Sequence, residues 1–150
     1  MANKTAVVLG CKGQDGSLMC KSLLEKNCKV VGLMRSELED QSNLHKLGID
    51  KDIEIKQGDI CNFNDVCSLL ESHQPESVYN LAAQSSVGKS FIQPHETIES
   101  IVNGTINILD ACKFLNFSGR VFFAGSSEMF GNIEEKANID YPQKPNSPYA

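Results

Sequence analysis

Three glycines, Gly10, Gly13 and Gly16, stand between an apolar run and a helical pattern, at a spacing that suits phosphate binding. The apolar run covers residues 6–9, and the helical pattern begins near Ser17. A glycine in such a turn can adopt positive φ, and its missing side chain lets backbone N–H groups approach an anion at a helix N-terminus. The spacing Gly-x-x-Gly-x-x-Gly is one residue longer than the common Gly-x-Gly-x-x-Gly fingerprint. The order of strand, glycine turn and helix predicts a cradle for a dinucleotide pyrophosphate.

An arginine follows the second apolar run, residues 29–34, at the position where dinucleotide folds recognise the adenosine ribose. The forked guanidinium of Arg35 matches the geometry of a 2′-phosphate, which favours NADP. Proteins that prefer NAD carry an acidic residue here, and Glu37 is close enough in sequence to bind the ribose. An ordinary surface position is the other interpretation of Arg35. We expect NADP and keep NAD as the alternative.

Two further runs end in residues that suit the adenine and the middle of a bound cofactor. Asp59 follows the third run and can accept a hydrogen bond from the adenine amino group, while Ile60 covers the ring. Capping of the next helix is an equally good interpretation of Asp59. After the fourth run, small residues stand where the backbone would pass close to a cofactor, although tight packing alone also explains the alanines. The candidate cofactor-binding residues here are Leu81, Ala82, Ala83 and Ser85.

The fifth run leads into two hydroxyls and a carboxylate, which belong to Ser126, Ser127 and Glu128. The carboxyl ends of parallel strands are where open α/β sheets bind their ligands. The pattern therefore favours a catalytic position. The alternative is that the serines end the strand and cap a turn.

The elements that must position these residues alternate between strand and helix along the chain. We predict strands over residues 5–9, 29–34, 53–56, 77–81 and 120–124, the last one nearly all apolar and therefore buried on both faces. Helices are predicted over residues 17–26, 62–72 and 94–114, with a short one near 42–47. In the long helix, Gly104 indicates close packing on the sheet, because glycine costs about 1 kcal/mol relative to alanine there. The alternation predicts an α/β fold, a Rossmann-type doubly wound parallel sheet in a single domain.

Composition excludes several classes of function. The chain has 150 residues and a net charge of −5, and no basic run, so a nucleic-acid surface is not expected. No apolar stretch approaches the ~20 residues that span a bilayer, and residues 1–4 lack signal-peptide character, so we expect a cytoplasmic protein without a membrane segment. The six cysteines form no Cys-x-x-Cys pair and no metal-ligand grouping, which indicates free thiols and no metal site. Cys11, inside the glycine loop, is the one thiol expected to face a ligand.

Seven short motifs occur together in one order along nearly the whole chain. They lie at residues 10–17, 58–60, 79–85, 103–105, 109–111, 126–131 and 147–149. In these motifs the sequence resembles the extended short-chain dehydrogenase/reductase family, and within it the GDP-mannose 4,6-dehydratases. Gln14 and Asp15 in the glycine loop favour that branch and join the cofactor-binding set. The glutamate of the Ser-x-Glu motif separates dehydratases from 4-epimerases.

The resemblance implies a role for each residue of the catalytic set. Tyr149, as a phenolate, would take the proton from the sugar 4-hydroxyl while hydride passes to the nicotinamide. Ser126 would hydrogen-bond that oxygen and the tyrosine. Glu128 would remove the C5 proton and help water leave from C6, after which the hydride returns to C6.

The chain departs from the family pattern at its end. The family carries a lysine four residues after the tyrosine, whereas this sequence stops at Ala150. We expect an incomplete NAD(P)-binding Rossmann domain over residues 1–150, truncated after about five strands and without the C-terminal region that binds substrate. The resemblance implies the N-terminal part of an enzyme that converts GDP-mannose to GDP-4-keto-6-deoxymannose, inactive by itself, in a homo-oligomer. The alternatives are another extended family member, such as a nucleotide-sugar epimerase or decarboxylase, and a non-catalytic NADP-binding sensor module.

Overall fold

A computed structural model of the protein describes residues 4–36 and 42–150. Its centre is a five-stranded sheet in the order β3-β2-β1-β4-β5, and every neighbouring pair of strands is parallel. The chain enters the sheet in the middle and extends first to one edge and then to the other, as in the predicted doubly wound fold. The strands are β1 (Thr5–Leu9), β2 (Lys29–Met34), β3 (Glu54–Gln57), β4 (Ser77–Asn80) and β5 (Arg120–Phe123).

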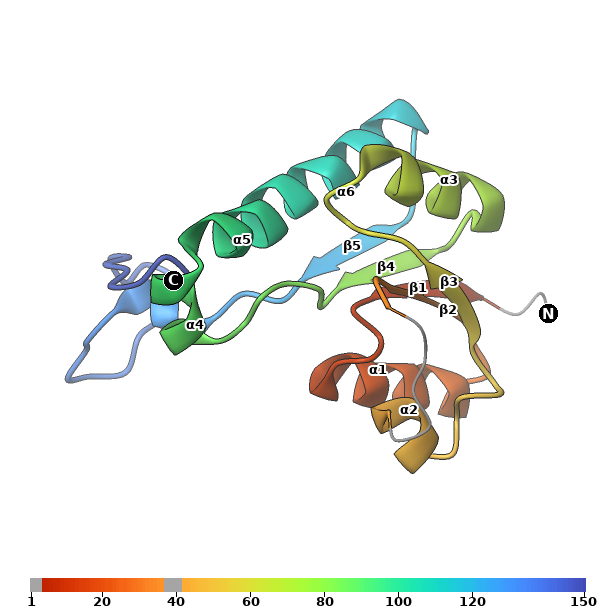
Figure 1. The fold of residues 1–150 in the computed structure, drawn as a ribbon, viewed down its shortest axis with the longest axis horizontal. Coiled ribbons are helices and arrows are strands. Elements are labelled where there is room, and N and C mark those ends of the chain that lie inside the picture. Colours follow the sequence, from red (N-terminus) through yellow and green to blue (C-terminus); the bar gives the residue numbers. More distant parts are fainter. Residues whose placement is uncertain (1–3, 37–41) are drawn as a thin grey trace.

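Helices lie on both faces of the sheet (Figure 1). One face carries α1 (Gln14–Glu25) and α2 (Asn43–Lys46), and the other carries α3 (Phe63–His73) and α6 (Gly104–Phe114). Between β4 and α6 the chain forms α4 (Val87–Ile92), α5 (Pro94–Ile98) and a π-helical turn, η1 (Glu99–Asn103), and a 3-10 turn, η2 (Ser127–Phe130), follows β5. Among the described residues, none of these helices combines the length and the apolar character needed to cross a membrane.

The side chains of β1 divide between two cores because successive residues of a strand point to opposite faces. Val7 and Leu9 pack toward α3 and α6, where Ile108 is 1% exposed. Ala6 and Val8 pack toward α1, against Leu23. Both cores hold the carboxyl ends of β1 and β2 in place beneath the loops that follow them.

The prediction that the fifth strand is buried on both faces is wrong. Val121, Phe122 and Phe123 are 39%, 49% and 48% exposed. Within the part of the chain that the structure describes, the strand pairs with β4 along one edge only, and on the α1 side a hollow of about 770 Å³ lies between Leu23 and the rings of Tyr79 and Phe122. The apolar composition of β5 is therefore not matched by burial among the described residues.

The predicted helix over residues 94–114 forms as one run of α5, η1 and α6, and several of its large apolar side chains lie on the outward side. The apolar residues Ile98, Val102 and Leu109 are 45%, 43% and 53% exposed. Small residues face inward instead, because this run packs very closely: a Cβ on Gly104 would lie 2.6 Å from Cδ1 of Ile60. The close packing predicted for Gly104 is confirmed, with the β3–α3 loop rather than a strand as its partner. The buried positions are Thr97, Ser100, Gly104, Ile108 and Ala111.

Candidate functional site

The glycine turn folds tightly on itself at the carboxyl end of β1. Gly10 has φ +79°, a conformation that favours glycine, and its carbonyl accepts from the N–H of Gly13 at 3.0 Å. A Cβ on Gly16 would lie 2.1 Å from the same carbonyl oxygen, and a Cβ on Gly10 would lie 2.7 Å from the carbonyl oxygen of Leu81. The turn thus has no room for side chains at either position.

Helix α1 begins at Gln14, three residues earlier than predicted, with Gly13 as its N-cap. Because glycine has no side chain, it leaves the first-turn N–H groups and the positive end of the helix dipole open to a ligand. This open helix end, beside a turn that has no room for side chains at positions 10 and 16, fits a pyrophosphate.

Two adjoining hollows run along the carboxyl edge of the sheet. The smaller, about 350 Å³, lies among the ends of β1, β2 and β3, and the larger, about 410 Å³, lies over the start of α1 and the ends of β4 and β5. They share Gly13, Leu81, Ala82 and Ala83, so the two halves of a dinucleotide would meet at the glycine turn. Of the other predicted cofactor residues, Gly10, Arg35, Asp59 and Ile60 line the smaller hollow, and Gln14, Asp15, Gly16 and Ser85 line the larger one.

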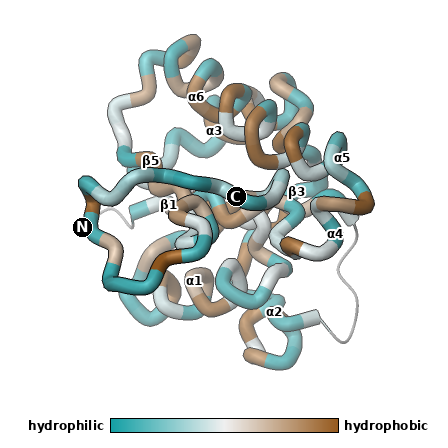
Figure 2. The backbone as a smooth tube through the Cα atoms, turned by 90° about the vertical axis from the view of Figure 1, so that its left-hand side faces the viewer, coloured by the Kyte–Doolittle hydropathy of each residue, from teal (hydrophilic) through white to brown (hydrophobic). Residues whose placement is uncertain are grey.

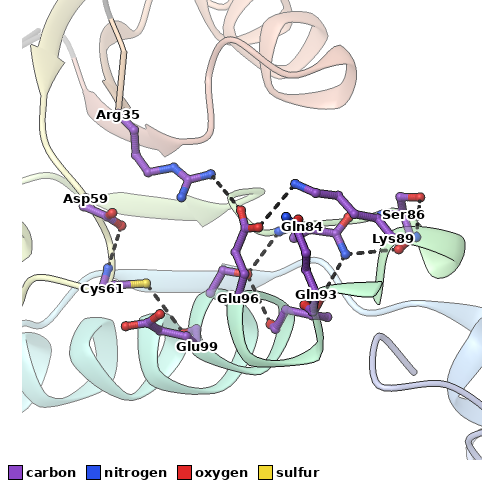
Figure 3. A network of polar contacts seen from close by, with 11 residues as sticks. Arg35, Asp59, Cys61, Gln84, Ser86, Lys89, Gln93, Glu96 and Glu99 are labelled. Carbon is purple, nitrogen blue, oxygen red and sulfur yellow. Dashed lines mark hydrogen bonds and ion pairs between the residues drawn. The ribbon is translucent and has the colours of Figure 1, made fainter. Parts of the chain in front are cut away.

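Asp59 shapes the turn between β3 and α3. Its Oδ1 accepts from the N–H of Cys61 at 2.9 Å (Figure 3), and its own N–H donates to Oδ2 of Asp65 at 2.9 Å. The N-cap of α3 is Asn62, whose Oδ1 accepts from Asn64. The helix-capping alternative for Asp59 is therefore wrong, because the residue sits three positions before the cap.

Arg35 leaves the end of β2 and reaches toward α5 (Figure 3). Its Nη2 lies 4.0 Å from Oε1 of Glu96, and its side chain is 61% exposed. Next to it, Ser36 accepts a hydrogen bond from Nζ of Lys12 at 3.1 Å. Glu37, the alternative ribose ligand, lies outside the described residues.

Cys11 does not face a ligand, contrary to the prediction. Its side chain is fully buried, with Sγ 3.7 Å from the carbonyl oxygen of Leu33, and it fills the space beside Gly32. Burial away from water raises the pKa of its thiol to about 11, because the charged thiolate loses hydration there. The loop position thus points Cys11 into the core. All six cysteines are free, and no group of metal-ligating side chains occurs within residues 4–36 and 42–150.

The residues after β5 form a short capped turn, which the sequence offered as the alternative to a catalytic position. Ser126 caps η2, since its Oγ accepts from the N–H of Glu128 at 3.2 Å. Ser126 and Tyr149 both line the larger hollow, so the structure brings them to the same cavity. Glu128 is exposed and is not one of the described residues that line this hollow. Asn80, Phe123 and Met129 line it too, and sequence reasoning missed them.

Gln84 holds the loop after β4 against α5 and η1 (Figure 3). Its Nε2 donates to Oγ1 of Thr97 at 2.9 Å and to the carbonyl of Ser86 at 3.1 Å, and its Oε1 accepts from the Ser86 N–H at 2.6 Å. The backbone N–H of Gln84 donates to Oγ of Ser100 at 3.1 Å. The amide is 8% exposed, so these bonds are buried and fix the segment that joins the two hollows.

A family model described as GDP-mannose 4,6 dehydratase matches residues 7–150. The chain belongs to this family. The match covers nearly the whole length, including the glycine turn and the segment after β5, and it confirms the family resemblance of the seven motifs.

Curated proteins similar to the chain carry the same family name. The chain is 35% identical to a GDP-mannose 4,6-dehydratase of Vibrio cholerae over 159 aligned positions, which cover 100% of this chain and 43% of that protein. It is 36% identical to GDP-mannose 4,6 dehydratase 1 of Arabidopsis thaliana, with 98% of this chain and 44% of that protein covered. The chain therefore spans less than half the length of these relatives.

Solved structures of epimerases share the fold. The chain superimposes with a TM-score of 0.83 on a Thermus thermophilus UDP-glucose 4-epimerase complexed with NAD, at 25% identity over 97% of this chain and 46% of that one. A UDP-glucose 4-epimerase from Brucella ovis gives a TM-score of 0.85 at 24% identity, over 97% of this chain and 43% of that one. These likenesses confirm the Rossmann-type fold predicted for this member of the dehydratase family.

Proposed function

We propose that the chain supplies the NADP-binding half and the catalytic edge of a GDP-mannose 4,6-dehydratase. The observation that carries this proposal is the pair of adjoining hollows, which meet at a helix N-terminus without a side-chain cap and are lined by all the predicted cofactor residues. Membership of the dehydratase family supports the reaction, and the NAD in the Thermus epimerase supports a nicotinamide cofactor. The cofactor, when bound, accepts a hydride and later returns it.

In the smaller hollow, Arg35 is proposed to bind the 2′-phosphate, and Asp59 and Ile60 the adenine. Arg35 lines the hollow and its side chain is 61% exposed, so a phosphate can replace water around the guanidinium. Ile60 is 6% exposed and held by Gly104, so it offers a fixed apolar surface to a base. The first turn of α1 binds the pyrophosphate.

In the larger hollow, Ser126 and Tyr149 are proposed to hold the sugar 4-hydroxyl, with Tyr149 taking its proton. The carboxylate of Glu128 is proposed to take the C5 proton and to assist loss of the C6 hydroxyl as water. Because Glu128 is exposed beyond the hollow, the sugar must lie on its open side. The likeness to UDP-glucose 4-epimerases keeps epimerisation as the second candidate, and Glu128 favours dehydration.

Titration of the 150-residue chain with NADP⁺ and NAD⁺ separately tests the cofactor assignment. We expect tighter binding of NADP⁺, and a loss of that preference in Arg35→Met. Tighter binding of NAD⁺ to the unaltered chain contradicts the role of Arg35. In a parallel assay with GDP-mannose, we expect no 4-keto sugar from this chain by itself, because it spans less than half the length of the dehydratases that it matches. Product formation contradicts that expectation.

We further propose that the protein is a homo-oligomer that associates through α5, η1 and α6. Their outward side carries an apolar stripe of Ile98, Val102, Ile106 and Leu109, each between 43% and 53% exposed, and Figure 2 shows hydrophobic segments along α5 and α6. Contiguous exposed apolar surface of this kind marks interaction sites. We expect Ile106→Asp to lower the molecular mass measured by analytical ultracentrifugation. Leu18→Asp on α1, a residue that is also about half exposed, should leave this mass unchanged. An unchanged mass in Ile106→Asp excludes this interface.

A cytoplasmic location is also part of the proposal. Six free cysteines, two of them in fully buried positions of the core, support a reducing compartment.

A further inference from the structure

Glu96 places one carboxylate between two cations that come from different elements (Figure 3). Its Oε1 lies 4.0 Å from Nη2 of Arg35 at the end of β2, and its Oε2 lies 3.3 Å from Nζ of Lys89 on α4. The carboxylate is 35% exposed, whereas the two cations are 61% and 46% exposed. All three side chains are thus open to an incoming ligand and to solvent.

The Arg35–Glu96 pair lies beside the smaller hollow. Arg35 lines that hollow, and so does Ser100, which follows Glu96 by about one helical turn. The ion pair therefore reaches from the end of β2 to the helical run on the opposite side of the hollow, where the 2′-phosphate would approach Arg35.

We propose that Glu96 competes with the cofactor 2′-phosphate for Arg35 and so is a specificity-determining residue for NADP over NAD. The inference rests on the proposed role of Arg35. Without a phosphate, the carboxylate neutralises part of the guanidinium charge. When a phosphate binds Arg35, Glu96 gives up this partner but keeps Lys89, so its charge does not become unpaired. Lys89 thereby makes the exchange easier, and NAD⁺, which lacks the 2′-phosphate, is indifferent to it.

The proposal predicts effects of opposite sign for two exposed positions. Glu96→Gln removes the competitor, so the ratio of the NAD⁺ to the NADP⁺ dissociation constant is expected to rise by about two- to fivefold, the range that an exposed ion pair supplies. Lys89→Met leaves Arg35 as the sole cation beside Glu96 in this network, so the same ratio is expected to fall by a similar factor. A purely structural role of either residue would change both affinities together and leave the ratio constant.

Matched controls separate this mechanism from a change in net charge. Asp110→Asn removes the same charge from α6, about 20 Å further along the helical run, and Lys113→Met removes a positive charge there. Both are expected to leave the ratio unchanged. In the double variant Arg35→Met/Glu96→Gln, the effect of the Glu96 substitution is expected to vanish. Thermal unfolding followed by circular dichroism checks that each variant is folded.

Each outcome of these titrations decides the proposal. Opposite shifts of the ratio in Glu96→Gln and Lys89→Met, both lost in the Arg35→Met background, support it. If Arg35→Met selectively weakens NADP⁺ while Glu96→Gln and Lys89→Met leave the ratio constant, the role of Arg35 stands and the role of Glu96 is overturned. If Arg35→Met leaves NADP⁺ binding intact, the proposed role of Arg35 and the inference built on it are both overturned.

Discussion

Replacement of Gly16 by alanine tests how closely the glycine turn is packed. The added Cβ would lie 2.1 Å from the carbonyl oxygen of Gly10 and 2.9 Å from Cα of Cys11, well inside the 3.4 Å of ordinary contact. Gly10 has little room to move. Its φ is +79°, and a Cβ built on it would lie 2.7 Å from the carbonyl oxygen of Leu81. Overpacking of this kind costs about 1–3 kcal/mol.

Alanine also has a favourable effect in a helix that has to be subtracted. It is better than glycine by about 1 kcal/mol in a helix interior. The net expectation for Gly16→Ala is a loss of up to about 2 kcal/mol, which lowers Tm by up to about 8 °C in a protein of this size. NADP⁺ binding should weaken as well, because the turn has to open for the methyl group.

Gly88→Ala is the matched control for this substitution. Gly88 lies in α4, and a Cβ there would meet nothing within 4 Å. The unfolded chain loses the same freedom in both variants, so their difference reports on the folded turn. Thermal unfolding followed by circular dichroism should show Gly88→Ala unchanged or slightly stabilised. Equal Tm values for the two variants would refute the argument that the turn has no space.

Three further outcomes are expected. Gln84→Met should destabilise the protein by about 1–3 kcal/mol in urea unfolding, because it leaves buried donors and acceptors unpaired. An unchanged urea midpoint would contradict a stabilising role of the buried Gln84 hydrogen bonds. The pKa of Glu54 is lowered to about 2, chiefly by a hydrogen bond from His73. The ionised carboxylate therefore adds to the free energy of unfolding above pH 4.5, and this contribution is lost as the pH falls toward 2. Glu54→Gln should reduce that acid-induced loss by at most about 1 kcal/mol, since the carboxylate is partly exposed. Gly104→Ala should destabilise the protein. In the Ile60→Ala background the same substitution should cost less, because the shorter side chain makes room for the methyl group. The urea midpoints of the single and double variants check this.

The elements best predicted from sequence are those with compact apolar runs. β1 and β2 begin and end at the predicted residues, since their side chains are buried on both faces of the sheet. The start of α1 was placed too late because Gly16, a weak helix former, sits in its first turn. α4 was missed, because it is shorter than two helical turns and shows no hydrophobic period, with the cap Ser86 as its local signal. The turn of η2 was expected only as an alternative, from the serines that follow the fifth run.

The sequence predicted the residues of the candidate site, but it did not predict the residues that contact them and hold them in place. Motif spacing places Gly13, Arg35 and Asp59 after successive strands, and the parallel topology then brings those strand ends to one edge. Glu96 is remote in sequence from Arg35, and Thr97 is remote from Gln84, and no local pattern reports such partners. The orientation of Cys11 was wrong for a related reason: a loop position says nothing of which way the side chain turns.

In the helical run of α5, η1 and α6, hydrophobic periodicity does not predict which side chains are buried. Its inward positions hold small residues, such as Ser100 and Gly104, because Ile60 and the loop after β4 approach them closely. Its outward positions hold Val102 and Ile106, which are 43% and 49% exposed. A pattern search assigns the larger apolar side chains to the core, but here close approach selects small ones beside Ile108 and leaves most of the large ones on the surface. The same packing that holds Ile60 against the smaller hollow therefore creates the apolar stripe, so the proposed cofactor site and the proposed interface occupy opposite sides of one helical run.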